Sequence, residues 1–178
     1  MRKIIVSIIT ILLIATVVFL GCYSMLMSDV DKVYHVENAE YITGEFTYSG
    51  WMKNGLFDGD GTLRFNRGGF FVGEFKEGKF EGHGEYSDAE GRLIYSGDFI
   101  NGKFDGQGLF ISPEGWVYEG AFKEGLFEGE GKYVNVKGQT YEGSFKRGLF
   151  DGEGKMTDGD LIVYGRWEEG EQIELYDY

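Results

Sequence analysis

The stretch Tyr118-Glu-Gly-Ala-Phe122-Lys-Glu-Gly-Leu-Phe-Glu-Gly-Glu-Gly-Lys-Tyr133 decides the fold. Rings and glycines alternate with polar residues, and side chains two apart lie on one face of a β-strand. Lys123, Glu124 and Gly125 interrupt the alternation, and glycine supplies the positive φ that a tight turn needs. The stretch therefore predicts two antiparallel strands joined by a turn, with similar turns at Gly55, Gly78, Gly102 and Gly148.

The same pattern recurs along the chain at intervals of 23, 24, 23 and 23 residues, measured between its central glycines. A chain with such a period is expected to stack its repeats, because a single hairpin cannot bury its apolar face. We place five repeats near residues 48–70, 71–94, 95–117, 118–140 and 141–162, and a partial copy at 163–170. The residues that define them are Tyr48, Gly50, Gly73, Phe75, Tyr95, Gly97, Phe99, Tyr118, Gly120, Phe122, Tyr141, Gly143 and Phe145.

A second block follows in each repeat and has the form Phe, acidic, Gly, x, Gly, as in Phe127-Glu-Gly129-Glu-Gly131. Together the two blocks resemble the MORN repeat. The first repeat departs from the pattern, because Trp51 and Met52 follow Gly50 and its second aromatic position is either shifted or lost. The resemblance implies an all-β fold, namely an elongated, twisted antiparallel sheet of tandem β-hairpins. It also implies tethering, assembly or dimerisation rather than catalysis, and association with phospholipids.

The repeated glycines predict close approach of another group to bare backbone, and we expect a ring from the adjacent hairpin to lie there. Ile42-Thr-Gly44-Glu-Phe46 resembles half a repeat and is expected to cap the first edge of the sheet. Residues 163–167 are expected to cover the last edge. The glutamates beyond them would discourage pairing with another chain: Glu168, Glu169, Glu171 and Glu174.

Residues 1–27 contain an apolar run long enough to cross a bilayer as a helix. Arg2 and Lys3 precede the run, so the positive-inside rule predicts a single-pass protein with a cytoplasmic N-terminus and the repeats outside. Two alternatives stay open: a lipoprotein signal, with Cys22 lipidated, or a cleaved secretion signal. Polar residues 28–40 are expected to form a linker before a β domain at 41–178.

The net charge of the chain limits the classes of partner that it can bind. All 30 acidic residues but only 15 of the 17 basic ones follow Met27, so that part carries 15 − 30 = −15. Such a surface repels phosphate backbones and excludes nucleic acid. It also disfavours anionic lipid headgroups. An acidic display face suggests a basic protein partner, and self-association into a homo-oligomer stays open.

One acidic residue per repeat forms a predicted ladder: Asp58, Glu81, Asp105, Glu128 and Asp151. Such carboxylates either bind calcium or accept backbone N–H hydrogen bonds in turns, and the second use is favoured because the ladder is too sparse for sharing an ion. His83 occupies a variable position, and no catalytic constellation or cofactor motif is present. Trp51, Trp116 and Trp167 either pack in the sheet or form a platform for ligands.

The sequence therefore predicts a non-catalytic, membrane-tethered scaffold or protein-interaction module with a protein partner. The alternative is a cell-envelope binding protein for glycan, lipid or cation ligands. Exposed, aligned tryptophans would favour the alternative, whereas buried tryptophans would favour the scaffold.

Overall fold

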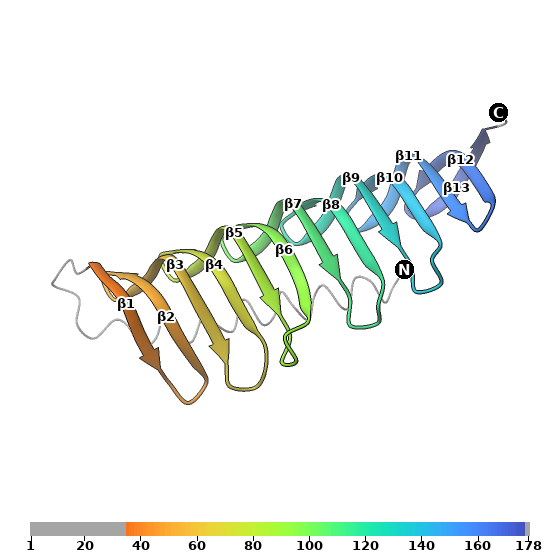
Figure 1. Ribbon diagram of the computed structural model, residues 1–178. Coiled ribbons are helices and arrows are strands. Elements are labelled where there is room, and N and C mark those ends of the chain that lie inside the picture. Colours follow the sequence, from red (N-terminus) through yellow and green to blue (C-terminus); the bar gives the residue numbers. More distant parts are fainter. Residues whose placement is uncertain (1–34, 177–178) are drawn as a thin grey trace. The chain divides into compact units, whose positions relative to one another are not determined.

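The computed structural model describes residues 35–176 and contains antiparallel β-strands that neighbour one another in chain order (Figure 1). These residues fall into two compact units, one that ends at Lys103 and one that begins at Phe104. Nothing within residues 35–176 forms a helix long and apolar enough to span a membrane. The predicted anchor at 1–27, with Cys22, lies outside the described residues.

The unit that ends at Lys103 holds the first six strands. They are β1 (His35–Ile42), β2 (Phe46–Lys53), β3 (Leu56–Phe65), β4 (Phe70–Lys76), β5 (Lys79–Ser87) and β6 (Leu93–Ile100). The unit that begins at Phe104 holds the other strands, except for Lys103, the first residue of β7. They are β7 (Lys103–Ile111), β8 (Val117–Lys123), β9 (Leu126–Val134), β10 (Thr140–Lys146), β11 (Leu149–Asp158), β12 (Leu161–Glu168) and β13 (Glu171–Tyr176).

Both ends of the strand series differ from the sequence-based expectation. Strand β1 begins at His35, inside the range predicted as a linker. The segment 42–46 does not cap an edge: it runs from the end of β1 to the start of β2, and residues 43–45 make the turn. At the other end β13 follows β12, so Glu171 and Glu174 lie within a strand and not beyond the last one. Neither β1 nor β13 carries the aromatic-glycine pattern of the repeats, so the repeat pattern does not predict these strands.

The turns inside the repeats are tight and use left-handed backbone, as the sequence predicts. In the β8–β9 turn, Glu124 has φ 50° and Gly125 has φ 83°. Two successive residues with positive φ characterise the type I′ turn, whose twist matches that of antiparallel strands. Asn54 and Asn101 occupy the first position in two other repeats, and asparagine tolerates this conformation better than most residues.

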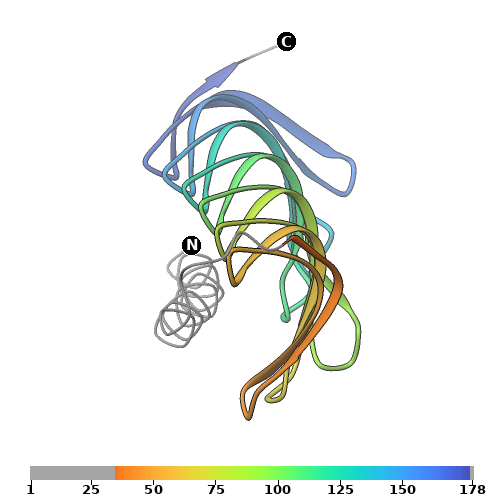
Figure 2. The same cartoon turned by 90° about the vertical axis from the view of Figure 1, so that its left-hand side faces the viewer.

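The repeat hairpins are strongly curved along their length (Figure 2). In the β8–β9 hairpin, Gly120 pairs with Gly131 and Phe122 pairs with Phe127. Ala121 alone stands between these pairs on β8, whereas residues 128–130 stand between them on β9. The additional residues form a bulge, and a bulge bends the strand that contains it.

A ring fills the inside of the bend. A Cβ atom added to Gly131 would lie 2.5 Å from the Tyr118 hydroxyl oxygen, and one added to Gly120 would lie 2.7 Å from it. The glycines are thus required by close approach of a ring, as predicted, but the prediction of its source was wrong. The ring belongs to the same hairpin, because the bend folds Tyr118 over its own backbone, and not to the adjacent one.

The bend also brings two rings of one hairpin into a stack. The rings of Tyr118 and Phe127 are parallel within 13° and their centroids are 3.7 Å apart. The same pair recurs as Tyr48 with Phe57, at 3.7 Å. Phe71 with Phe80 and Tyr141 with Phe150 stack at 3.9 Å.

The second aromatic residue of each repeat joins one hairpin to the preceding one. Phe145 meets the ring of Tyr118 edge-on at 4.9 Å and that of Phe127 at 5.9 Å. It also contacts Tyr141 of its own hairpin at 5.3 Å. Edge-to-face pairs of this kind are favourable beyond the apolar area they bury. Within each unit the rings therefore form a continuous, buried core.

Candidate interaction surface

The acidic ladder connects successive hairpins. Each of its carboxylates accepts a hydrogen bond from the backbone N–H of the first residue in the next hairpin turn. The pairs are Asp58 with Glu77 (3.3 Å), Glu81 with Asn101 (2.9 Å), Asp105 with Glu124 (3.2 Å), Glu128 with Arg147 (3.0 Å) and Asp151 with Glu169 (3.4 Å). Hydrogen bonding in turns was predicted, but the donors are 18 to 20 residues away and not local.

A second hydrogen bond accompanies each of these contacts. The N–H of the turn glycine donates to the carbonyl that precedes the ladder carboxylate, as Gly148 does to Phe127 at 2.9 Å. We call the two bonds together the turn clasp. The clasp gives each ladder carboxylate a structural partner. Within residues 35–176, no three histidine, cysteine or acidic side chains are grouped to hold a metal ion.

The hydroxyl groups of the core tyrosines also form hydrogen bonds within the protein. The Tyr118 hydroxyl donates to the carbonyl of Ala121 at 2.8 Å, and the Tyr141 hydroxyl donates to that of Ser144 at 3.2 Å. Burial, followed by the nearby charge of Glu130, raises the pKa of Tyr118. The same two causes, with nearby Asp151 and Glu153, raise the pKa of Tyr141 to about 12. These hydroxyls stay neutral donors in neutral solution.

Two of the three tryptophans belong to the core. Trp167 is 2% exposed and meets the Tyr141 ring edge-on at 5.1 Å. Trp116 is 6% exposed and lies 5.1 Å from the ring of Phe110. Only Trp51 is open, at 37%. It occupies the bulge position and lies over Gly59. The burial of Trp116 and Trp167 is the outcome expected of a scaffold, whereas Trp51 is exposed.

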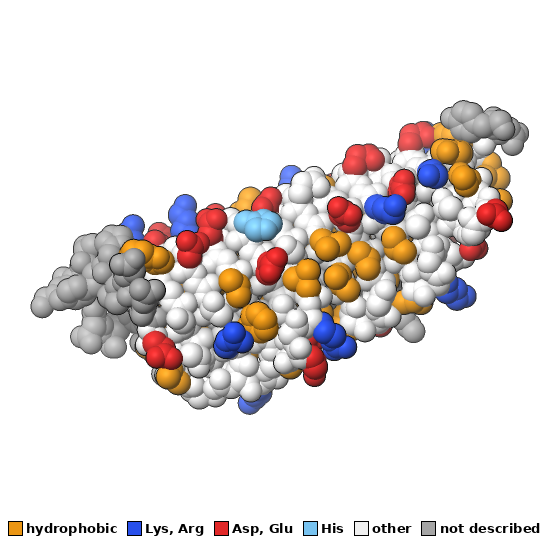
Figure 3. All heavy atoms as spheres, viewed as in Figure 1, with side chains coloured by type: hydrophobic (Ala, Val, Ile, Leu, Met, Phe, Trp, Pro, Cys, Tyr) orange, Lys and Arg blue, Asp and Glu red, His pale blue; other side chains and the backbone are white. Residues whose placement is uncertain are grey.

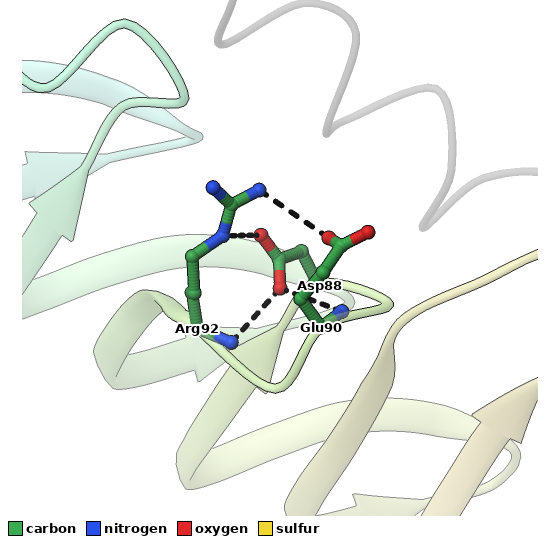
Figure 4. A network of polar contacts seen from close by, with 3 residues as sticks. All are labelled: Asp88, Glu90 and Arg92. Carbon is green, nitrogen blue, oxygen red and sulfur yellow. Dashed lines mark hydrogen bonds and ion pairs between the residues drawn. The ribbon is translucent and has the colours of Figure 1, made fainter.

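Loops between repeats share a polar framework that sequence reasoning missed. Asp88 accepts hydrogen bonds from the backbone N–H groups of Glu90 and Arg92, and from the Arg92 guanidinium at 2.7 Å (Figure 4). Burial alone would raise the pKa of Asp88, but these bonds hold it below its ordinary value. Ser112 and Asn135 accept the equivalent backbone bonds in the next two loops. A serine, aspartate or asparagine three residues before glycine was the available signal.

The outward-facing side chains of the sheet are mixed in charge (Figure 3). Glu142 bridges Lys132 at 2.8 Å and Lys155 at 3.9 Å across neighbouring strands. His83 lies 3.2 Å from the Asp98 carboxylate, and both side chains are more than half exposed. His83, which the sequence places at a variable position, is thus exposed. The view in Figure 3 shows side chains of both charges together with hydrophobic side chains.

The repeats have a counterpart among known families. The model of the MORN repeat matches residues 71–91, 95–117, 118–140 and 141–161. A comparison with curated proteins found no match. Residues 48–70 are not among the matched segments, yet Tyr48 stacks on Phe57 and Asp58 forms a turn clasp as in the matched repeats. Tandem matches and a shared pattern of contacts lead to one conclusion: the chain belongs to the MORN repeat family.

Proposed function

We propose that this protein is a non-catalytic scaffold that binds another protein through its repeat sheet and is tethered to a membrane by residues 1–27. The observation that carries the proposal is the internal use of the repeat-defining side chains. The rings, glycines and ladder carboxylates all make contacts within or between hairpins, so the repeat motif stabilises the sheet itself. What it leaves for partners is the outward face and the strand edges.

The tether is supported by the sequence of the first 27 residues. A run of apolar residues preceded by Arg2 and Lys3 favours insertion with the N-terminus in the cytoplasm and the repeats on the other side. Lipidation at Cys22 would attach the chain through a lipid instead, and cleavage as a secretion signal would release it from the membrane; both leave the same repeats outside. Intact-mass measurement of the mature protein separates the three forms.

The proposal is tested by crosslinking in the native cells followed by affinity capture. The full-length chain is one bait and residues 28–178 are a second bait. Recovery of one defined protein at constant stoichiometry by both baits supports the scaffold. Recovery of no protein by either bait, with glycan or metal retained instead, would contradict it and favour an envelope protein that binds glycan, lipid or cation ligands.

A matched control for the capture is a chain whose outward face is altered while the core stays intact. Glu142→Ala removes the bridge to Lys132 and Lys155 without touching a ring. Such a variant keeps the fold, because exposed ion pairs contribute little to stability. A client that binds the outward face near these strands would be lost from this bait and retained by the wild type.

A further inference from the structure

The edge formed by β13 differs from the rest of the sheet. Within residues 35–176, the only strand that pairs with β13 is β12. A strand edge of this kind presents backbone N–H and C=O groups that another strand can use. β13 contains no proline and no lysine, and the charged side chains that it carries are Glu171 and Glu174, which repel an acidic strand and attract a basic one.

Apolar side chains are unusually exposed beside this edge. Leu161 and Leu175 are 63% and 65% exposed, and Ile162 and Ile173 are 51% and 53% exposed. Leu161 lies on the same face of β12 as the buried Trp167, because their positions in this regularly paired strand differ by six, an even number. Leu175 lies on that face as well, since it pairs with Gly165, two residues from Trp167.

The ring core has no continuation at this place. In the preceding hairpin, Phe145 pairs with Phe150, whose ring contributes to the core. The residue that pairs with Trp167 is Gln172. The face that carries the rings therefore has exposed leucines in β12 and β13, namely Leu161 and Leu175, in place of further rings.

The charge of this region indicates what could cover it. Residues 161–176 contain four glutamates and one arginine, Arg166, a sum of 1 − 4 = −3. Glu171 and Glu174 lie in β13 itself and are exposed. A second copy of the chain would bring the same glutamates opposite one another, and like charges across strands are destabilising. A strand with basic side chains would be complementary.

We infer that β13 is a docking edge for an extended segment of a partner protein in which apolar and basic side chains alternate. The segment adds a strand to the sheet. Its apolar side chains cover Leu161 and Leu175, and its lysines or arginines face the glutamates. The inference rests on the proposed scaffold function and specifies one of its binding surfaces.

The test uses the full-length chain in detergent and a short fluorescent peptide of alternating valine and lysine. Fluorescence anisotropy measures its dissociation constant. The expected result is saturable binding that weakens on adding moderate salt, because part of the attraction is electrostatic. A peptide with the same sequence and N-methyl groups on alternate backbone nitrogens is expected to bind about tenfold more weakly, because it cannot form a strand pair. Equal binding of both peptides would overturn the proposal.

Matched variants locate the site. Glu171→Lys with Glu174→Lys is expected to weaken binding about tenfold, whereas Glu45→Lys with Asp60→Lys changes the net charge equally and leaves binding within about twofold. Leu161→Ser with Leu175→Ser is expected to weaken binding as well. Equal loss in both charge-reversed proteins would contradict a site at β13. A dimer of the wild-type protein would also contradict the proposal if the Leu161→Ser, Leu175→Ser variant did not form it and the peptide did not dissociate it. In that case a second copy of the chain would occupy the edge.

The failure of this inference can be told apart from failure of the scaffold function. Crosslinked capture in cells is repeated with the variant that carries Glu171→Lys and Glu174→Lys. A client recovered equally by this variant and the wild type would overturn the β13 site and support the scaffold. Loss of that client from the variant alone would support both.

Discussion

The carboxylate of Glu81 accepts a hydrogen bond from the backbone N–H of Asn101 at 2.9 Å, across 20 residues of sequence. The next N–H, that of Gly102, donates to the Phe80 carbonyl at 2.8 Å. Asn101 has φ 52°, so this turn is tight and its N–H groups project together. One acidic side chain in each hairpin thus fixes the turn of the following hairpin, and the repeat motif encodes contacts between repeats as well as within them.

Removal of a clasp should loosen the sheet. We expect Glu81→Ala to lower the free energy of unfolding by about 1 kcal/mol, the usual contribution of a hydrogen bond, and to lower the denaturant midpoint accordingly. Glu114→Ala is the control, because Glu114 is exposed in a loop and belongs to no clasp. Equal midpoints for the two variants would show that the ladder carboxylates do not hold the turns.

The glycines under the rings should tolerate no side chain. We expect Gly131→Ala to destabilise the protein by about 3 kcal/mol, because its Cβ would overlap the Tyr118 ring and force it out of a packed position. Gly44 has ordinary backbone and no heavy atom within 4 Å of an added Cβ, so Gly44→Ala should be close to neutral. Thermal unfolding followed by circular dichroism compares them. A stable Gly131→Ala protein would contradict the ring placement.

Much of the fold could be predicted from the sequence because the period of the repeat and the period of a strand act together. The turn at Glu124 and Gly125 follows from glycine chemistry, and the buried ring of Tyr118 follows from alternation. The stack of Tyr118 on Phe127 could not be predicted in this way. It depends on a bulge of two additional residues in β9, and alternation alone does not reveal a change of register.

The ring between hairpins should be replaceable by a flexible apolar chain but not by a small one. Phe145→Ala removes contacts with the rings of Tyr118 and Phe127 and should cost about 4 kcal/mol. Phe145→Met should cost less than about 1.5 kcal/mol, since methionine adapts to irregular space and Met52 occupies the equivalent position in the first repeat. Chemical denaturation of both variants measures the difference. An equal loss in the free energy of unfolding for the two variants would show that the volume of the side chain at position 145 is not what stabilises the packing.

Stability should fall in alkaline solution. Tyr141 has its pKa raised from 10.0 to about 12 in the folded protein, chiefly by burial. Between these values the unfolded chain loses the hydroxyl proton and the folded chain keeps it, so stability is full below pH 10 and is lost as pH rises toward 12. Denaturant midpoints across this range measure the loss, and Tyr141→Phe should reduce it. A midpoint that rises with pH would contradict the burial of the hydroxyl.

Residues of the candidate interaction surface could be predicted only where they recur in each repeat. The ladder was found because Glu128 and its equivalents recur, although their partners in the next turn were hidden by the distance along the chain. The edge at β13 was missed because Gln172 and Leu175 replace the ring and the glycine that mark a repeat. The only sequence feature that marks this edge is the absence of the repeat pattern, and that absence can be interpreted only when the pairing of β12 with β13 is known.

The most direct test of the account is the accessibility of single tryptophans to a neutral quencher. Three proteins, each retaining one tryptophan with phenylalanine at the other two positions, are compared by fluorescence quenching. If the ring face is closed by packing between repeats, Trp116 and Trp167 resist quenching and only Trp51 is accessible, as their exposures require. Ready quenching of Trp116 and Trp167 would show an open aromatic face, contradict the scaffold account and support a ligand-binding platform.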